Sequence, residues 1–215
     1  YVGKIVLAIS GVAPGTTTRI EKYFDLNANG VIDAGDALSQ SFVVRDGTVP
    51  TSFPDGANYV RNWNIPADED GAANGQIRVE LPYPGLDGVT DFVAGARLFK
   101  VSDAATGFAP VTRAFTIRQE TLPQGVTGRI TVAGTANPLA NAPVVLMPPD
   151  GSPVTGDLTD AKGNYTLYSP PGQFVVMPML PGFVADFRAG MAAVNSGMAT
   201  LNLAVSAATR TISGK

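Results

Sequence analysis

The sequence predicts an all-β protein made of two tandem β-sandwich domains. Short β-branched and aromatic runs recur along the chain, and Gly, Pro, Asn and Asp bound them at about the spacing typical of sandwiches. Helical periodicity is hard to find. The chain of 215 residues contains 24 Gly and 17 Pro, which is below the share typical of low-complexity chains. With 45% hydrophobic residues it can bury a core, so we expect these Gly and Pro residues to lie in turns between strands.

The first domain is expected to contain seven strands, the number found in a small immunoglobulin-like sandwich. They are Lys4–Ile9, Thr18–Phe24, Leu38–Arg45, Asn58–Ile65, Gln76–Leu81, Phe92–Val101 and Val111–Arg118. A polar segment with Pro and Gly, Gln119–Gly125, follows these runs. Because such segments are typical of linkers, we place the boundary near Leu122, with domains at 1–122 and 123–215.

The second domain shows a similar pattern of short strands and tight turns. The expected strands are Val126–Val132, Pro143–Met147, Asn164–Tyr168, Gln173–Met179 and Thr200–Val205. Its turns contain Asp150-Gly151 and Asp160-Ala-Lys-Gly163. Near the chain end, Thr211-Ile-Ser-Gly-Lys215 resembles Gly125-Val-Thr-Gly-Arg129, so this segment is either the start of a further repeat or a last strand.

Five pieces of the second domain occur in a characteristic order. They are Val126-Thr-Gly-Arg-Ile, Asn137-Pro-Leu-Ala-Asn-Ala-Pro-Val-Val145, Thr159-Asp-Ala-Lys-Gly-Asn-Tyr-Thr-Leu167, Pro170-Pro-Gly-Gln-Phe-Val-Val176 and Pro181-Gly-Phe183. Together, over about ninety residues, they resemble the carboxypeptidase regulatory-like (transthyretin-like) family. The resemblance implies a non-catalytic folding or spacing module of secreted and cell-surface proteins. Adhesin members often carry a Lys–Asn isopeptide bond from the first strand. Because Arg129 stands in that strand here, we predict no such bond in this domain.

The strongest chemical pattern is Asp25-Leu-Asn-Ala-Asn-Gly-Val-Ile-Asp-Ala-Gly-Asp36. Oxygen-bearing side chains stand at positions 1, 3, 5, 9 and 12, and Gly30 stands at position 6. Calcium takes about six to eight oxygen ligands, which a short loop supplies from alternate residues around a tight turn. The segment resembles EF-hand and dockerin-type loops. The resemblance assigns Ca²⁺ as the cofactor, held by Asp25, Asn27, Asn29, the Val31 carbonyl, Asp33 (directly or through water) and Asp36.

Two departures from the EF-hand pattern shape this prediction. Asp36 replaces the closing Glu, and the flanking Thr16–Ile20 and Ser41–Val44 favour strands, so we expect the loop to close a β-hairpin. A helix–loop–helix is the alternative, and a metal-free polar turn is another. Three carboxylates and two amides predict a modest dissociation constant, about 10⁻⁴–10⁻³ M, typical of extracellular modules.

A second acidic segment contains Asp68, Glu69 and Asp70. If consecutive strands alternate in direction, these residues lie at the same end of the sandwich as the Asp25–Asp36 loop. There they form either a second metal site or an ordinary solvated loop.

Trp63 lies in an aromatic and amide-rich run, Asn58–Ile65. Strand alternation would place Tyr59, Trp63 and Ile65 on one face together with Arg61. Such a strand could stack on a sugar, but a single Trp in a sandwich strand is more often part of the core.

Composition excludes several functions. The chain has no His and no Cys, which removes Ser-His-Asp triads, cysteine nucleophiles, zinc sites of the usual ligands and disulfides. The net charge of −3 argues against nucleic-acid partners, and no apolar run is long enough for a membrane helix. Two carboxylates would suffice for glycoside hydrolysis, but no acid pair stands in apolar surroundings. We therefore expect no enzyme.

The resulting expectation is a non-catalytic, calcium-stabilised structural or adhesive module of a secreted or cell-surface multidomain protein. Its expected partners are neighbouring domains and a surface protein or glycan ligand. The alternative is a carbohydrate-binding accessory module of a secreted enzyme. A dockerin-like docking element would need two calcium loops, whereas we find only one in the sequence.

Overall fold

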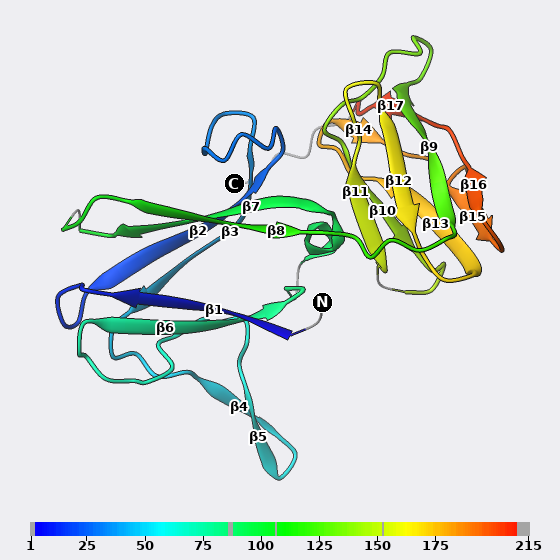
Figure 1. Ribbon diagram of the computed structural model, residues 1–215. Coiled ribbons are helices and arrows are strands. Elements are labelled where there is room, and N and C mark those ends of the chain that lie inside the picture. Colours follow the sequence, from blue (N-terminus) through cyan, green and yellow to red (C-terminus); the bar gives the residue numbers. More distant parts are fainter. Residues whose placement is uncertain (1–2, 86–87, 106, 152, 210–215) are drawn as a thin grey trace. The chain divides into compact units, whose positions relative to one another are not determined.

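A computed structural model describes residues 3–209 except 86, 87, 106 and 152, and it is almost entirely β-structure (Figure 1). Its described residues form 17 strands and one 3₁₀ turn, and no α-helix, so the all-β prediction is confirmed. Two compact units divide the chain. Unit 1 comprises Tyr1–Gly88 and Ala96–Phe115, and unit 2 comprises Val89–Gly95 and Thr116–Lys215. The sequence pattern placed one boundary near Leu122 and did not indicate the excursion of Val89–Gly95.

Unit 1 contains two antiparallel sheets that enclose a core. The strands are β1 (Gly3–Ser10), β2 (Thr17–Asp25), β3 (Ala37–Arg45), β6 (Gln76–Tyr83), β7 (Gly95–Asp103) and β8 (Val111–Ile117). One sheet has the order β3-β2-β7-β8 and the other is the pair β1-β6. Alternate residues face inward, as strand geometry requires: Ile20 of β2 and Val79 of β6 are fully buried and belong to the same apolar cluster.

The expected strand Asn58–Ile65 is confirmed only over Asn58–Arg61, and its expected place in the sandwich is wrong. Residues Asn58–Arg61 form β5, which pairs with β4 (Ser52–Asp55) in a separate two-stranded hairpin. Figure 1 shows this hairpin projecting from the sandwich strands of unit 1. The turn between its strands contains Gly56 at φ 60°, a left-handed conformation that glycine adopts readily. A short hairpin between β4 and β5 can therefore form. The sandwich of unit 1 consequently has six strands in its two described sheets instead of the seven expected.

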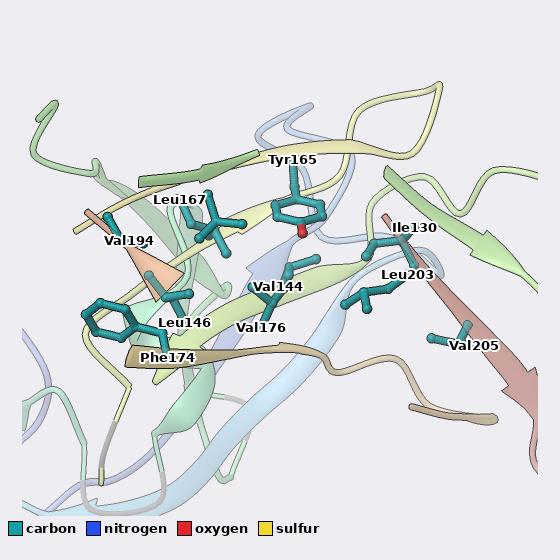
Figure 2. Close-up of a cluster of buried hydrophobic side chains, with 11 residues drawn as sticks. Ile130, Val144, Leu146, Tyr165, Leu167, Phe174, Val176, Val194, Leu203 and Val205 are labelled. Atoms are coloured by element: carbon teal, nitrogen blue, oxygen red, sulfur yellow. The ribbon is translucent and has the colours of Figure 1, made fainter. Parts of the chain in front are cut away.

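Unit 2 also consists of two sheets. The strands are β9 (Gly125–Val132), β10 (Pro143–Met147), β11 (Thr155–Leu158), β12 (Asn164–Tyr168), β13 (Gly172–Pro178), β14 (Phe183–Val184), β15 (Met191–Val194), β16 (Met198–Thr200) and β17 (Leu203–Ala207). One sheet has the order β11-β10-β13-β15 and the other β12-β9-β17-β14, with β16 also pairing with β9. Apolar side chains from both sheets meet between them (Figure 2).

The largest of these core side chains is Tyr165, which is only 2% exposed. Its hydroxyl donates a hydrogen bond of 2.6 Å to the carbonyl of Leu201, so the buried polar atom has a partner. Burial raises the pKa of this phenol well above its ordinary value. The tyrosine therefore serves packing and stays neutral.

The expected strand Thr200–Val205 is divided into β16 and β17. Between them, Leu201 N–H donates to the Thr127 carbonyl at 2.8 Å, and Asn202 Oδ1 accepts from Arg129 N–H at 2.9 Å. A side-chain amide thus replaces a backbone partner at this break. Strands β11, β14 and β15 were not expected, because Thr155–Leu158 is polar and the other two are short.

The polar segment expected to be a linker is fastened to unit 2 at its first residue. Gln119 Nε2 donates to the Thr166 carbonyl at 2.8 Å, while its Oε1 accepts from Thr155 Oγ1 at 2.9 Å and from Tyr168 N–H at 3.2 Å. One amide side chain therefore links β11 to β12, and the segment does not begin as a free spacer.

Candidate metal loop

The loop Asp25–Asp36 joins β2 to β3, two antiparallel neighbours in the four-stranded sheet of unit 1. It therefore closes a β-hairpin, as the flanking β-branched residues predicted, and the helix–loop–helix alternative is wrong. The pairing runs from Thr17↔Arg45 to Phe24↔Ala37. The two strands thus hold both ends of the loop side by side.

Asp25, the first predicted ligand, is buried at the end of β2 with 1% exposure. Its Oδ1 accepts from Asn29 N–H at 3.1 Å, and its Oδ2 accepts from Gly30 N–H at 2.8 Å. Gly30 has φ 76°, a left-handed conformation that suits glycine and turns the loop back on itself. These contacts wrap the chain around the first carboxylate.

The side chains at loop positions 3, 5 and 9 converge on one point. Asn27 Nδ2 and Asn29 Nδ2 both donate to Asp33 Oδ2, at 3.0 and 2.7 Å. Asp33 Oδ1 accepts from Gly35 N–H at 2.8 Å. These hydrogen bonds, from the backbone of Gly35 first and then from the two amides, lower the pKa of Asp33. The carboxylate is consequently ionised at neutral pH.

Asp36 closes the loop. Its Oδ1 accepts from Leu26 N–H at 3.2 Å and its Oδ2 from Asp33 N–H at 3.0 Å. Val31 N–H donates to Asn29 Oδ1 at 2.7 Å. All six predicted ligand residues thus lie in one tightly hydrogen-bonded turn.

The donor set of this loop fits a hard cation, because every candidate side chain offers carboxylate or amide oxygen. Within the described ranges, no three Asp, Glu, His or Cys side chains gather closely enough to form a metal group by themselves. The site would therefore depend on Asn27, Asn29 and a backbone carbonyl in addition to its carboxylates. Ile32, which stands between Val31 and Asp33 in the loop, is partly buried.

The acidic segment Asp68–Asp70 does not lie at the loop's end of unit 1, so that expectation is wrong. Asp68 N–H donates to the Thr48 carbonyl at 2.9 Å, and Thr48 follows β3 where β3 pairs with the start of β2. The metal loop follows the other end of β2. The error arose from counting Asn58–Ile65 as a sandwich strand, which reversed the inferred chain direction.

Each acid of this segment also has a separate partner. Asp68 is fully buried and accepts from Gly47 N–H at 2.9 Å and Arg78 N–H at 3.0 Å. Glu69 forms a two-pronged ion pair with Arg61. Asp70 accepts from Ala72 N–H at 2.8 Å and Asn74 Nδ2 at 3.2 Å. The three carboxylates therefore hold loops in place and do not converge.

Trp63 is neither in a strand nor among the buried core residues, so the core interpretation is wrong. It lies half-buried in the turn after β5. The Arg61 guanidinium is 4.1 Å and the Lys4 ammonium 4.9 Å from the centroid of its ring. These cations use the ring surface that a sugar would need. Two aromatic residues of the hairpin are exposed, Tyr59 on β5 at 78% and Phe53 on β4 at 48%.

Sequence reasoning missed a buried carboxylate of unit 1, that of Asp46, which joins residues from distant loops. It is 2% exposed, and its Oδ2 accepts from Gly15 N–H at 2.8 Å and Gly75 N–H at 2.9 Å. Its Oδ1 accepts from Asn74 N–H at 3.4 Å. The only local signal is an Asp-Gly turn after a strand, which does not reveal the distant partners.

Comparisons with known proteins identify no family. No family model and no curated protein match the chain. Its structure is similar to that of the Bacillus anthracis TIE protein, with a TM-score of 0.35 and 11% identity over 96% of this chain and 34% of that one. The chain thus spans about a third of the TIE protein.

Two pilus proteins give comparable values. The group B streptococcus pilus 2b backbone protein has a TM-score of 0.31 and 10% identity over 97% of this chain and 94% of that one. The shaft pilin SpaA from Lactobacillus rhamnosus GG has a TM-score of 0.30 and 11% identity over 99% and 100%. Similarity at this level does not assign a function, so the function is argued from the residues. Among the described residues, no helix has the length and apolar character needed to cross a membrane.

Proposed function

We propose that this chain is a non-catalytic structural or adhesive module of a secreted or cell-surface multidomain protein, stabilised by calcium in the Asp25–Asp36 loop. The observation that carries the proposal is the use of the carboxylates. Asp25, Asp46 and Asp68 are buried, and each accepts backbone N–H groups that hold turns together. Carboxylates committed in this way stabilise a fold and do not transfer protons to a substrate.

One carboxyl group has the perturbed pKa that often marks catalytic acids. Burial raises the pKa of Asp157, although hydrogen bonds from Thr166 N–H and Leu158 N–H oppose the shift. The bond from Thr166, at 3.3 Å, joins β12 to β11 inside unit 2, and the bond from Leu158, at 2.9 Å, lies within β11. The raised pKa of Asp157 is therefore explained by its burial between packed strands. This explanation favours a structural protein over a glycosidase.

The metal would act as a cross-link for the loop. Asp25, Asn27, Asn29, Asp33 and Asp36 would supply side-chain oxygens, and Val31 its carbonyl. A divalent cation at this position would offset repulsion among the three carboxylates and restrain the connection between β2 and β3. Affinity in the range of about 10⁻⁴–10⁻³ M would keep the loop filled at extracellular calcium concentrations.

Thermal unfolding with and without calcium tests the metal. At about 10 mM calcium, binding linkage predicts roughly 1.5–2.5 kcal/mol of added stability for unit 1, and therefore a higher melting temperature than in chelator. Asp25→Ala should abolish this difference. Asp70→Ala, which changes an exposed aspartate outside the loop, should retain it. Equal melting temperatures of the unaltered protein in calcium and in chelator would contradict the metal assignment.

Carbohydrate binding remains the alternative, and a surface protein or glycan stays a proposed ligand. The feature that supports this alternative is the exposed Tyr59 on the projecting hairpin. Against it stands the Trp63 ring, which already interacts with Arg61 and Lys4. The structural module is therefore the better-supported function.

A further inference from the structure

The chain passes from unit 1 into unit 2 and back before it makes its final transition. Strand β6 of unit 1 ends at Tyr83, and β7 pairs with β2 from Ala96 onward. The intervening segment Val89–Gly95 belongs to unit 2. Its first part, Val89–Phe92, is the 3₁₀ turn η1. Three covalent connections therefore run between the units, at 88/89, 95/96 and 115/116.

Within unit 2, this segment lies against the outer edge of β11. The turn η1 contacts both β10 and β11. Val93 is fully buried and forms a parallel bridge with Gly156 of β11. The next residue, Ala94, donates its N–H to the Gly156 carbonyl at 2.8 Å. Residues 93–94 thus give β11 a neighbour on the edge that β10 leaves open.

The close approach of this segment to β11 requires a glycine at position 156. A Cβ atom at that position would lie 2.9 Å from Val93 Cα, 2.9 Å from Val93 Cγ2 and 2.9 Å from the Val144 carbonyl oxygen. Such distances are too short for any real side chain. Gly156 therefore lets β11 lie between β10 on one side and Val93 on the other. Gly95, with φ 138°, then supplies the glycine-specific conformation where the chain returns to unit 1.

We propose that residues 89–95 act as an internal tie that makes the stability of the β11 edge in unit 2 depend on the folding of unit 1. While unit 1 is folded, β6 and β7 hold both ends of the segment, so it is presented to β11 at a high effective concentration. When unit 1 unfolds, the same residues become part of a long flexible chain. Binding them to the β11 edge then costs more conformational entropy than it does while unit 1 is folded. Unit 2 then loses edge protection although its own sequence is unchanged.

This coupling extends the proposed function and does not depend on calcium. A structural module under load or heat would respond as one piece at this edge, because opening one unit weakens a defined strand of the other. A single flexible linker between two independent sandwiches would not give this behaviour.

Hydrogen exchange on the full chain tests the tie. Asp46→Ala removes a carboxylate whose described contacts lie entirely in unit 1, so it raises the rate of opening of unit 1. We expect the amides of Ala94 and of Thr155–Leu158 to exchange at least tenfold faster in this variant. The β9–β12 pairing should keep its protection. Unchanged exchange at β11 while unit 1 opens more often would overturn the proposal.

A second pair of variants keeps the test independent of Asp46. Val93→Ala trims the seated side chain, whereas Val194→Ala trims an equally buried valine on β15 of unit 2. The tie predicts that only Val93→Ala exposes Thr155–Leu158 to exchange and residues 89–95 to proteolysis with unit 1 still folded. If both valine variants give the same pattern, Val93 is an ordinary core residue and the tie is wrong.

Discussion

Aspartate side chains serve different purposes at the two ends of unit 1. At the end where β2 begins, Asp46 accepts N–H groups from residues 28 to 31 positions away in the sequence. At the other end, Asp25, Asp33 and Asp36 accept N–H groups from residues at most ten positions away, all within one loop. Long-range contacts join separate loops and stabilise the fold without an ion. Local contacts organise a single loop, the one proposed to hold calcium.

The largest expected effect comes from removing a buried carboxylate at the end where β2 begins. Asp68→Ala leaves the N–H groups of Gly47 and Arg78 without their acceptor, so we expect unit 1 to lose about 2–4 kcal/mol, measured by calorimetry. Asp70→Ala is the matched control, because Asp70 is exposed and should cost under about 1 kcal/mol. Similar losses for both variants would show that this end does not depend on buried carboxylates.

A pair of glycines separates backbone strain from metal binding. Gly30 in the loop has φ 76° and Gly11 near the other end has φ 83°, and a Cβ at either position meets no atom within 4 Å. Alanine at either site should therefore cost about 1 kcal/mol from strain alone. Only Gly30→Ala should also weaken the response of the melting temperature to calcium. An equal calcium response in both variants would argue that the turn at Gly30 has no part in ion binding.

The same distinction explains which features could be predicted from the sequence. The hairpin character of the Asp25–Asp36 loop was predictable because β-branched residues flank it. Its hydrogen bonds connect neighbours in the sequence, so the spacing of Asp and Asn residues already implied a tight turn. Strands with clear alternation, such as Thr18–Phe24, were also found for local reasons.

The features that were missed depend on distant partners. Nothing near Asp46 in the sequence indicates that Gly15 and Gly75 will meet it. The run Asn58–Ile65 alternates like a sandwich strand, but its β5 part pairs with the adjacent β4. Val89–Gly95 shows no sign that it will pack in the other unit, because Gly156 shapes that seat from more than sixty positions away. Tertiary contacts decided each case over local pattern.

The smallest expected difference concerns how the stability of unit 1 changes at acidic pH. Burial raises the pKa of Asp46, but hydrogen bonds from the backbone of Gly75, Gly15 and Asn74 outweigh burial and hold the pKa below its ordinary value of 3.8. A carboxyl group with a lowered folded-state pKa stabilises the fold above its unfolded-state pKa. That contribution is lost as pH falls through the folded-state value.

We therefore expect the melting temperature of unit 1 to decrease as the pH is lowered from 5 to about 2. Asp46→Asn should flatten this dependence, since the amide does not titrate. Asp33→Asn, measured in chelator, should flatten it less, although the pKa of Asp33 is also lowered. Asp33 is exposed and its bonds are local, so water replaces them more readily when the carboxyl group is protonated. An Asp46→Asn profile parallel to that of the unaltered protein would mean that the long-range carboxylate contacts do not govern the acid response.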